Sequence, residues 1–227
     1  MRKTETQANC FIKNMSKDIA AFDFFDAIYC INLKERKDRL AHSYLEFESL
    51  GITDKVIIFD AIKNETACNG CRDSHIEIIR QAKEKGLKNI LVLEDDIFFL
   101  EKDRGYYNSL FKAAKSLPEF NLLYLSANTL IRLERENEYL FKAKECLTTH
   151  SICYNHSIFD TILNDYDNVG IIDQYLKNII QPMNKSYIAS RLCTTQRGGY
   201  SDIEREYVDY DFMIYRFNHH TRSITPS

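Results

Sequence analysis

Tryptophan is absent from this chain of 227 residues, and glycine and proline are scarce, with seven and three residues. The chain also has no internal repeat, no low-complexity tract and no linker rich in proline or glycine, so we expect a single domain. Without tryptophan, any aromatic ring that stacks on a ligand must come from the 14 tyrosines or the 14 phenylalanines.

An excess of positive charge is also missing. The chain has 30 lysines and arginines against 33 aspartates and glutamates, which gives a formal net charge of −3. Proteins that bind nucleic acid usually carry a basic surface, so nucleic acid is not expected as a partner. A local basic pocket for a phosphate remains compatible with this balance. Hydrophobic residues make up 44% of the chain, which is enough for a substantial core.

Long hydrophobic runs are absent too. No apolar stretch approaches the ~18 residues that cross a bilayer, and the polar residues 1–20 lack the apolar segment of a secretory signal. The seven cysteines are an odd number and favour free thiols in a reducing compartment over a disulfide framework. We therefore expect a cytoplasmic protein without a transmembrane segment, although peripheral membrane contact is compatible with this prediction. Residues 1–25 are expected to form a flexible extension and residues 26–227 the domain.

The first half of the chain alternates between strand and helix patterns. Short apolar runs predict strands at 26–33, 56–61 and 90–93, and the charged segment 34–50 has apolar residues at helical spacing. A second helix is expected to begin at Ser74. Strands that alternate with helices predict an α/β sheet with parallel pairing, covered by helices on both faces.

The second half of the chain is less regular. A charged segment at 132–144 is expected to be a surface loop or a hairpin. The remaining patterns predict helices at 105–117, 157–165 and 173–180, strands at 122–126 and 150–154, an edge strand at 187–193, and an aromatic tail at 207–217 that packs back on the domain.

Ser74 and Glu77 have the S-x-x-E spacing of a capping box, so Ser74 is predicted to open a helix after a loop at 63–73. His75 would then lie at a helix N-terminus, where it could face an anion. The alternative is structural, with Ser74 as a cap and His75 packed in the core. Cys68 and Cys71 form C-N-G-C, but a second pair with zinc spacing is missing, so structural zinc is not expected.

Three consecutive carboxylates, Glu94, Asp95 and Asp96, follow the strongest strand pattern. Ligands of open α/β sheets bind beyond the carboxyl ends of the strands, where Asn32 and Asp60 are also predicted to lie. Adjacent carboxylates suit Mg²⁺ or Mn²⁺, which prefer oxygen ligands. Alternation along the strand would place Glu94 and Asp96 on one side, as metal ligands, and Asp95 on the other. The alternative is a solvated acidic turn.

Six short motifs carry a family resemblance. They are INLKERKDR at 31–39, GCRDSH at 70–75, LVLEDDIFF at 91–99, LLYLS at 122–126, THSICY at 149–154 and QRGGYSDI at 196–203. In this order they resemble glycosyltransferase family 25, which includes lipopolysaccharide-type and collagen-modifying sugar transferases. The resemblance spans about 26–205. It implies a GT-A-like fold, with a Rossmann-type, mostly parallel sheet and flanking helices, a UDP-sugar donor and an Asp-x-Asp-type site for Mn²⁺ or Mg²⁺.

The same resemblance implies where the donor binds. Arg36 and Arg39 follow the first predicted strand, and arginine suits bidentate contact with phosphate. Their alternative role is a solvated helix face that pairs with Glu35 and Asp38. The full set of residues expected to contact the donor is Asn32, Arg36, Arg39, Asp60, His75, Glu94 and Asp95.

The known reactions of this family are inverting, so a base must take the proton of the acceptor hydroxyl. Asp173 is the first candidate, because it begins a predicted helix in the second half of the chain. Its alternative role is that of an N-cap. Asp202 is the rival base, because the neighbouring Gly198 and Gly199 would let the backbone approach a ligand.

The leading hypothesis is a metal-dependent glycosyltransferase that moves a hexose, galactose or glucose, from a UDP-sugar to a hydroxyl of a saccharide or glycosylated acceptor. A non-catalytic module of the same fold that binds a sugar nucleotide or glycan is the first alternative. The second is a Mg²⁺-dependent nucleotidyltransferase. A P-loop enzyme is disfavoured, because G-x-x-x-x-G-K-[ST] does not occur in the chain.

Overall fold

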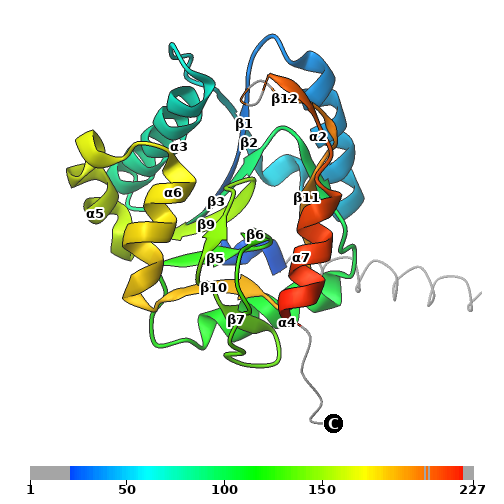
Figure 1. Ribbon diagram of the computed structural model, residues 1–227, viewed down its shortest axis with the longest axis vertical. Coiled ribbons are helices and arrows are strands. Elements are labelled where there is room, and N and C mark those ends of the chain that lie inside the picture. The colour runs from blue at the N-terminus through cyan, green and yellow to red at the C-terminus, as the bar shows by residue number, and fades with distance from the viewer. Residues whose placement is uncertain (1–20, 202, 204, 222–227) are drawn as a thin grey trace, which may run out of the picture.

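In the computed structural model, the described residues are 21–201, 203 and 205–221, and they form a central seven-stranded sheet with the order β2-β1-β3-β9-β5-β10-β7 (Figure 1). The strands are β1 (Ala27–Asn32), β2 (Val56–Asp60), β3 (Asn89–Glu94), β5 (Leu122–Tyr124), β7 (Leu140–Lys142), β9 (Ser151–Asn155) and β10 (Ser186–Ala189).

Most strands of this sheet run in one direction. β1 is parallel to both β2 and β3, and β5 is parallel to β10. β9 is antiparallel to both β3 and β5, and β7 is antiparallel to β10. Only β9 and β7 are therefore reversed within the described sheet, and the predicted mostly parallel α/β architecture is confirmed.

The register of β1, β2 and β3 aligns their carboxyl ends. Asn32 lies opposite Asp60 in the β1–β2 pair, and Ile31 lies opposite Glu94 in the β1–β3 pair. The polar residues that end these strands therefore share one edge of the sheet, as expected from their positions in the sequence.

Helices cover both faces of the sheet, and Figure 1 shows α3, α5 and α6 on one side with α2 and α4 on the other. The helices are α2 (Lys37–Leu50), α3 (Ala67–Glu84), α4 (Arg104–Lys115), α5 (Phe159–Asn164), α6 (Ile172–Tyr175) and α7 (Asp211–Thr221). Alternate residues of β3 enter opposite cores: Ile90 and Val92 pack on the side of α3, and Leu91 and Leu93 on the side of α2 and α4. This double cover explains why the strand is apolar throughout.

Three two-stranded pairs and several short helical turns of the described chain lie outside the central sheet and the main helices. The two-stranded pairs are β4 (Ile97–Phe99) with β11 (Thr194–Gln196), β12 (Gly199–Ser201) with β13 (Glu206–Val208), and β6 (Asn128–Thr129) with β8 (Cys146–Leu147). The single turns are Ala21–Phe24, Thr53–Lys55, His156–Ile158, Tyr166–Asn168 and Gln181–Met183, with a π-helical turn at Leu176–Ile180.

The predicted start of α3 is wrong. The helix begins at Ala67, where the Thr66 side chain accepts a hydrogen bond from the Asn69 N–H at 3.2 Å. Ser74 lies inside the helix, donates to the Gly70 carbonyl at 2.7 Å and accepts from the Ile62 N–H at 2.8 Å. A side chain at Gly70 would bring its Cβ within 2.6 Å of the Ile62 oxygen, so this glycine permits close packing and does not mark a loop.

Two other predictions need correction. The strand near Tyr187 is not an edge strand, because β10 lies between β5 and β7. The edge strand is β7, which lies in the charged segment 132–144. The hairpin alternative for that segment holds, because Arg135 forms an antiparallel bridge with Phe141. Charged flanks concealed this short strand from the sequence pattern.

The ends of the described chain pack on the domain. Phe22 and Phe25, which precede the expected domain boundary at residue 26, are buried beside Phe111 of α4. At the other end, Met213 and Phe217 of α7 are buried, which confirms that the aromatic tail packs back on the domain. Residues 1–20 of the expected extension lie outside the described residues.

The described chain contains six free cysteines, Cys30, Cys68, Cys71, Cys146, Cys153 and Cys193, as expected for free thiols. Among the helices of residues 21–221, leaving aside 202 and 204, none combines the length and apolar character that crossing a membrane requires.

Candidate active site

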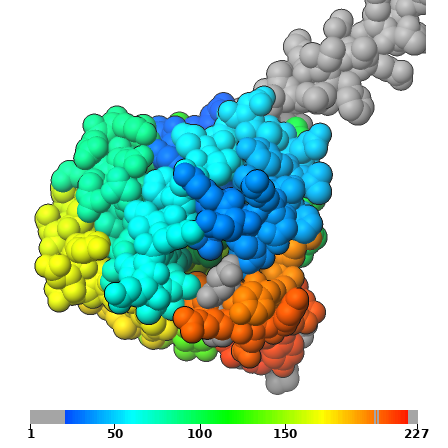
Figure 2. Space-filling view, turned by 90° about the horizontal axis from the view of Figure 1, so that it is seen from above, coloured from blue at the N-terminus to red at the C-terminus, as the bar shows by residue number. Residues whose placement is uncertain are grey.

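A cavity of about 410 Å³ lies at the carboxyl ends of β1, β2 and β3. Figure 2 looks down on this end of the molecule, where segments coloured blue, cyan and orange meet around a hollow. Its walls come from the chain after β1 and β2, from α3, from the end of β3, and from β11 and β12. Its volume lies within the roughly 300–1,000 Å³ of typical ligand pockets.

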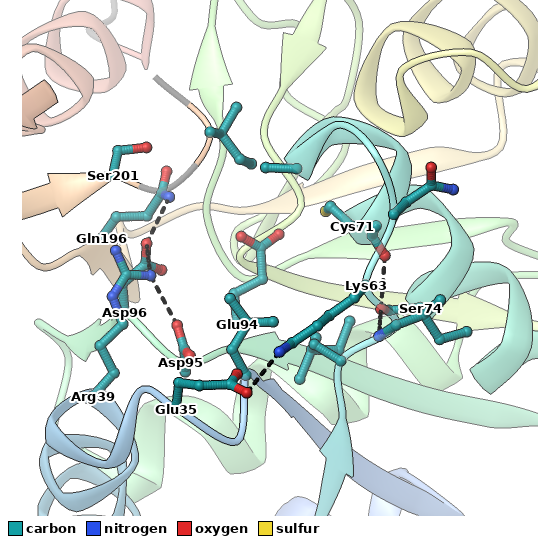
Figure 3. A pocket seen from close by; sticks show the side chains of 18 of the residues that line it. Glu35, Arg39, Lys63, Cys71, Ser74, Glu94, Asp95, Asp96, Gln196 and Ser201 are labelled. Carbon is teal, nitrogen blue, oxygen red and sulfur yellow. Dashed lines mark hydrogen bonds and ion pairs between the residues drawn. The ribbon is translucent and has the colours of Figure 1, made fainter. Parts of the chain in front are cut away.

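The three carboxylates of the acidic run all line this cavity. Strand β3 ends at Glu94, so Asp95 and Asp96 lie in the turn before β4. Strand alternation therefore does not apply to them, and the expected placement of Asp95 opposite Asp96 is wrong. Both contact one guanidinium, because Nη1 of Arg39 lies 2.9 Å from Asp95 Oδ1 and 3.5 Å from Asp96 Oδ2 (Figure 3).

Asp95 is a fixed, paired carboxylate. Besides Arg39, it accepts a hydrogen bond from Asn32 Nδ2 at 2.7 Å, and its backbone oxygen accepts from the Ser43 hydroxyl at 2.9 Å. Burial raises the pKa of Asp95, while the contacts to Arg39 and Asn32 act in the opposite direction. Asp95 therefore ties β1 and α2 to the end of β3.

Asp96 is buried but only partly satisfied. Its Oδ2 accepts from Gln196 Nε2 at 3.3 Å, whereas its Oδ1 is buried and has no hydrogen-bond partner among the described residues. Burial, followed by the negative charge of Glu94, raises the pKa of Asp96 to about 7 against the opposing effect of Arg39. An unpartnered carboxylate oxygen beside a cavity suits an oxygen-preferring cation.

Glu94 points into the cavity between two groups of side chains, with Arg39, Asp95 and Asp96 on one side and Cys71 on the other (Figure 3). It accepts a hydrogen bond from the Thr149 hydroxyl at 2.8 Å. Burial alone would raise the pKa of Glu94, but His75 and Thr149 outweigh burial and the pKa is lowered.

His75 does not lie at a helix N-terminus. It is a fully buried residue inside α3, with Nδ1 3.0 Å from the Tyr154 hydroxyl and Nε2 3.7 Å from Glu94 Oε1. The packed alternative is therefore the observed one, and His75 approaches the cavity only through Glu94.

The residues near the first strand divide into two groups. Asn32 and Arg39 join the carboxylates, and Arg39 also donates from Nη2 to the Tyr200 carbonyl at 2.7 Å. Arg36 forms an ion pair with Asp38 at 3.1 Å, and Asp60 pairs at 2.9 Å with Lys34 on the exposed surface. Neither Arg36 nor Asp60 is among the described residues that line the cavity.

Asp173 lies at the start of α6, as predicted, but it is not among the described residues that line the cavity. The N-cap of α6 is Ile171, and Asp173 lies inside the first turn. Its Oδ2 accepts from the Thr148 N–H at 3.2 Å, and its Oδ1 is buried and finds no partner in the described chain. Burial raises the pKa of the cavity residue Cys71 well above its usual value, and the charges of Glu94 and Asp173 add to this effect. Asp202 lies outside the described residues.

The contribution of β11 to the site is not predicted by the sequence. Gln196 pairs with Ile97 across the β4–β11 ladder and bonds to Asp96, and the Arg197 N–H donates to the Asp96 carbonyl at 2.6 Å. The motif QRGGYSDI marked this segment, but nothing local in the sequence specifies its pairing with β4.

Comparison with solved structures defines the class of fold. The crystal structure of a glycosyltransferase involved in the glycosylation of the major capsid of PBCV-1 matches with a TM-score of 0.52 and 12% identity, over 83% of this chain and 98% of that chain. The fold is therefore GT-A-like. Two others match less closely: A197 from STIV (TM-score 0.47, 8% identity, 80% of this chain and 92% of that chain) and mannose-1-phosphate geranyltransferase from Thermus thermophilus (0.44, 9%, 72% and 72%).

Sequence comparison identifies the family. The family model for glycosyltransferase family 25, described as LPS biosynthesis protein, matches residues 68–191, which is more than half of the chain. The chain belongs to glycosyltransferase family 25, so its enzyme class is that of a glycosyltransferase. No curated protein sequence matches the chain.

Proposed function

We propose that the protein transfers a hexose, galactose or glucose, from a UDP-sugar to a hydroxyl of a saccharide or glycosylated acceptor, with inversion and with the help of a divalent cation. Family membership supports sugar transfer. The observation that carries the proposed site is the buried, unpartnered Oδ1 of Asp96 beside a cavity of about 410 Å³ at the carboxyl ends of the parallel strands.

The carboxylates fit a hard cation. Asp96 would hold Mn²⁺ or Mg²⁺, with Glu94 as the second carboxylate, because both line the cavity and offer only oxygen atoms. When bound, the ion neutralises charge on the diphosphate that leaves with the nucleotide. Asp95 is held by Asn32 and Arg39 and would position its neighbours instead of coordinating the ion.

Arg39 is the proposed phosphate contact. Its guanidinium lines the cavity and is held in one orientation by Asp95 and by the Tyr200 carbonyl. A planar guanidinium fixed in this way is prepared to donate to a diphosphate oxygen. Asn32 supports this role indirectly, because it holds Asp95 in place.

Asp173 is the proposed base. Its Oδ1 has no hydrogen-bond partner among the described residues, and the contact of Oδ2 with the Thr148 N–H holds the carboxylate in place. The base would take the proton of the acceptor hydroxyl as that oxygen attacks the sugar. Asp202 remains the rival candidate.

One experiment separates the proposed reaction from its alternatives. The protein is incubated with a panel of nucleotide sugars and Mn²⁺, and the products are identified. UDP and free or transferred hexose are expected. Release of pyrophosphate would indicate a nucleotidyltransferase, and binding without turnover would indicate a non-catalytic module. Full activity in EDTA or in Asp96→Ala would refute the role of the cation, and Asp60→Ala serves as the exposed control.

A further inference from the structure

A second group of metal-binding side chains lies on the α3 side of the cavity. Cys71 and His75 are one helical turn apart on α3, and Glu94 ends β3. One ligand atom from each residue, a sulfur, a ring nitrogen and a carboxylate oxygen, lies within 4.8 Å of the other two. The sulfur and the imidazole set this group apart from the all-oxygen carboxylates around Asp96.

The spacing between His75 and Glu94 suits two ligands of one ion. Nε2 of His75 lies 3.7 Å from Glu94 Oε1, which is too long for a hydrogen bond. Ligand atoms at the usual zinc distances in a tetrahedron are about 3.3–3.8 Å apart. The same Nε2 is fully buried and has no hydrogen-bond partner within the described part of the chain.

The second ring nitrogen of His75 supports the same conclusion. Nδ1 lies 3.0 Å from the Tyr154 hydroxyl. A metal-bound His75 would carry its proton on Nδ1, donate it to the Tyr154 oxygen and present the lone pair of Nε2 to the ion. Histidines that bind metals are commonly oriented by a hydrogen bond to their other nitrogen.

We propose that Cys71, His75 and Glu94 bind a zinc-class divalent cation, a second ion beside the Mn²⁺ or Mg²⁺ proposed at Asp96, with Glu94 shared by the two sites. Thiolate and imidazole ligands favour Zn²⁺, whereas Mg²⁺ and Mn²⁺ prefer oxygen. Cys71 and Glu94 both line the cavity (Figure 3), so the fourth coordination position would open toward it, as in zinc sites that bind water or a substrate oxygen. The ion would join α3 to the end of β3 and fix the carboxylate of Glu94.

Cobalt(II) provides a spectroscopic test that is independent of sugar transfer. The purified chain is stripped with a chelator and titrated with Co²⁺, whose thiolate complexes absorb in the near ultraviolet. We expect one equivalent of Co²⁺ to produce a thiolate charge-transfer band that Zn²⁺ removes. Cys71→Ser should abolish the band. Cys68→Ser is the matched control and should retain it, because Cys68 lies on the same helix but outside the group.

A second variant keeps the test decisive if Cys71→Ser does not fold. Tyr154→Phe preserves the core ring and removes the hydroxyl that orients His75, so Co²⁺ affinity should fall about 10- to 100-fold with an unchanged circular dichroism spectrum. Glu94 is left intact, because the two proposed sites share it. The absence of a band, or a band that survives Cys71→Ser, would overturn the proposal. Loss of the band in Cys68→Ser would also overturn it, by indicating a Cys68–Cys71 chelate.

Discussion

Replacing Asp96 with asparagine should stabilise the metal-free protein, and by an amount that depends on pH. Burial and the neighbouring Glu94 raise the pKa of Asp96 from 3.8 to about 7 in the folded state. The folded state therefore holds its proton over a pH range in which the unfolded state has lost it. Because the pKa of Asp96 is higher in the folded state than in the unfolded state, the unfolding free energy of the wild type is highest below about pH 4. It falls as the pH rises to about 7.

The size of the effect follows from the pKa difference. About three pKa units correspond to roughly 4 kcal/mol of unfolding free energy, which is a ceiling because the charges around Asp96 rearrange on ionisation. Asparagine cannot ionise, so the Asp96→Asn variant does not lose this unfolding free energy as the pH rises. The stability of the variant relative to the wild type should therefore increase by about 2 kcal/mol between pH 4 and pH 5.5, and by up to about 4 kcal/mol at pH 8.

Urea unfolding at pH 4.5, 6 and 8 in the presence of EDTA measures this difference. Asp60→Asn is the control, because Asp60 ends β2 at the same end of the sheet but is exposed and paired with Lys34. The unfolding free energy of Asp60→Asn should stay within about 0.5 kcal/mol of the wild-type value at each pH. A difference for Asp96→Asn that is flat with pH, or that favours the wild type as the pH rises, would refute the reasoning. Adding Mn²⁺ at pH 8 should reduce the difference in unfolding free energy between the two proteins, because only the wild type has a carboxylate at position 96 to bind the ion.

Three further predictions concern other parts of the site and fold. Arg39→Ala should raise the KM for the donor more than it lowers kcat, whereas Arg36→Ala, which lies outside the cavity, should leave both within a few-fold; equal effects in steady-state kinetics would contradict the phosphate role of Arg39. Asp173→Asn should lower kcat about 10²- to 10⁴-fold with donor affinity retained, and normal turnover would exclude it as the base. Gly70→Ala should destabilise the fold by about 1–3 kcal/mol in urea unfolding, because the new Cβ meets the Ile62 oxygen at 2.6 Å; Gly170→Ala, where no described atom lies within 4 Å of the added Cβ, should be near neutral.

Local patterns in the sequence were sufficient for the central elements. The apolar runs of β1, β2 and β3 and the helical spacing of α2 fix these elements through periodicity alone, and a parallel arrangement then places Asn32 and Glu94 at one edge of the sheet. The prediction that the site lies at this edge therefore required no tertiary detail.

The finer geometry of the site depends on features that periodicity does not contain. The side on which Asp95 lies is set by the turn after Glu94, and the partner of Asp96 is set by the long-range pairing of β4 with β11. The predicted start of α3 is too late because glycine is typical of loops, whereas Gly70 lies inside the helix and lets it pack closely against the Ile62 backbone. In each case the deciding contact joins residues that are not neighbours along a helix or strand.

The pairing of β4 with β11 has a consequence for the order of events during synthesis. Asn32, Arg39 and Asp96 emerge from the ribosome early, but Gln196 and Arg197 close around Asp96 only after the whole central sheet has been made. A nascent or truncated chain that stops before β11 lacks the Gln196 and Arg197 contacts to Asp96 even when every strand of the central sheet is present. The last contacts around Asp96 therefore form only after the strands of the sheet have been synthesised.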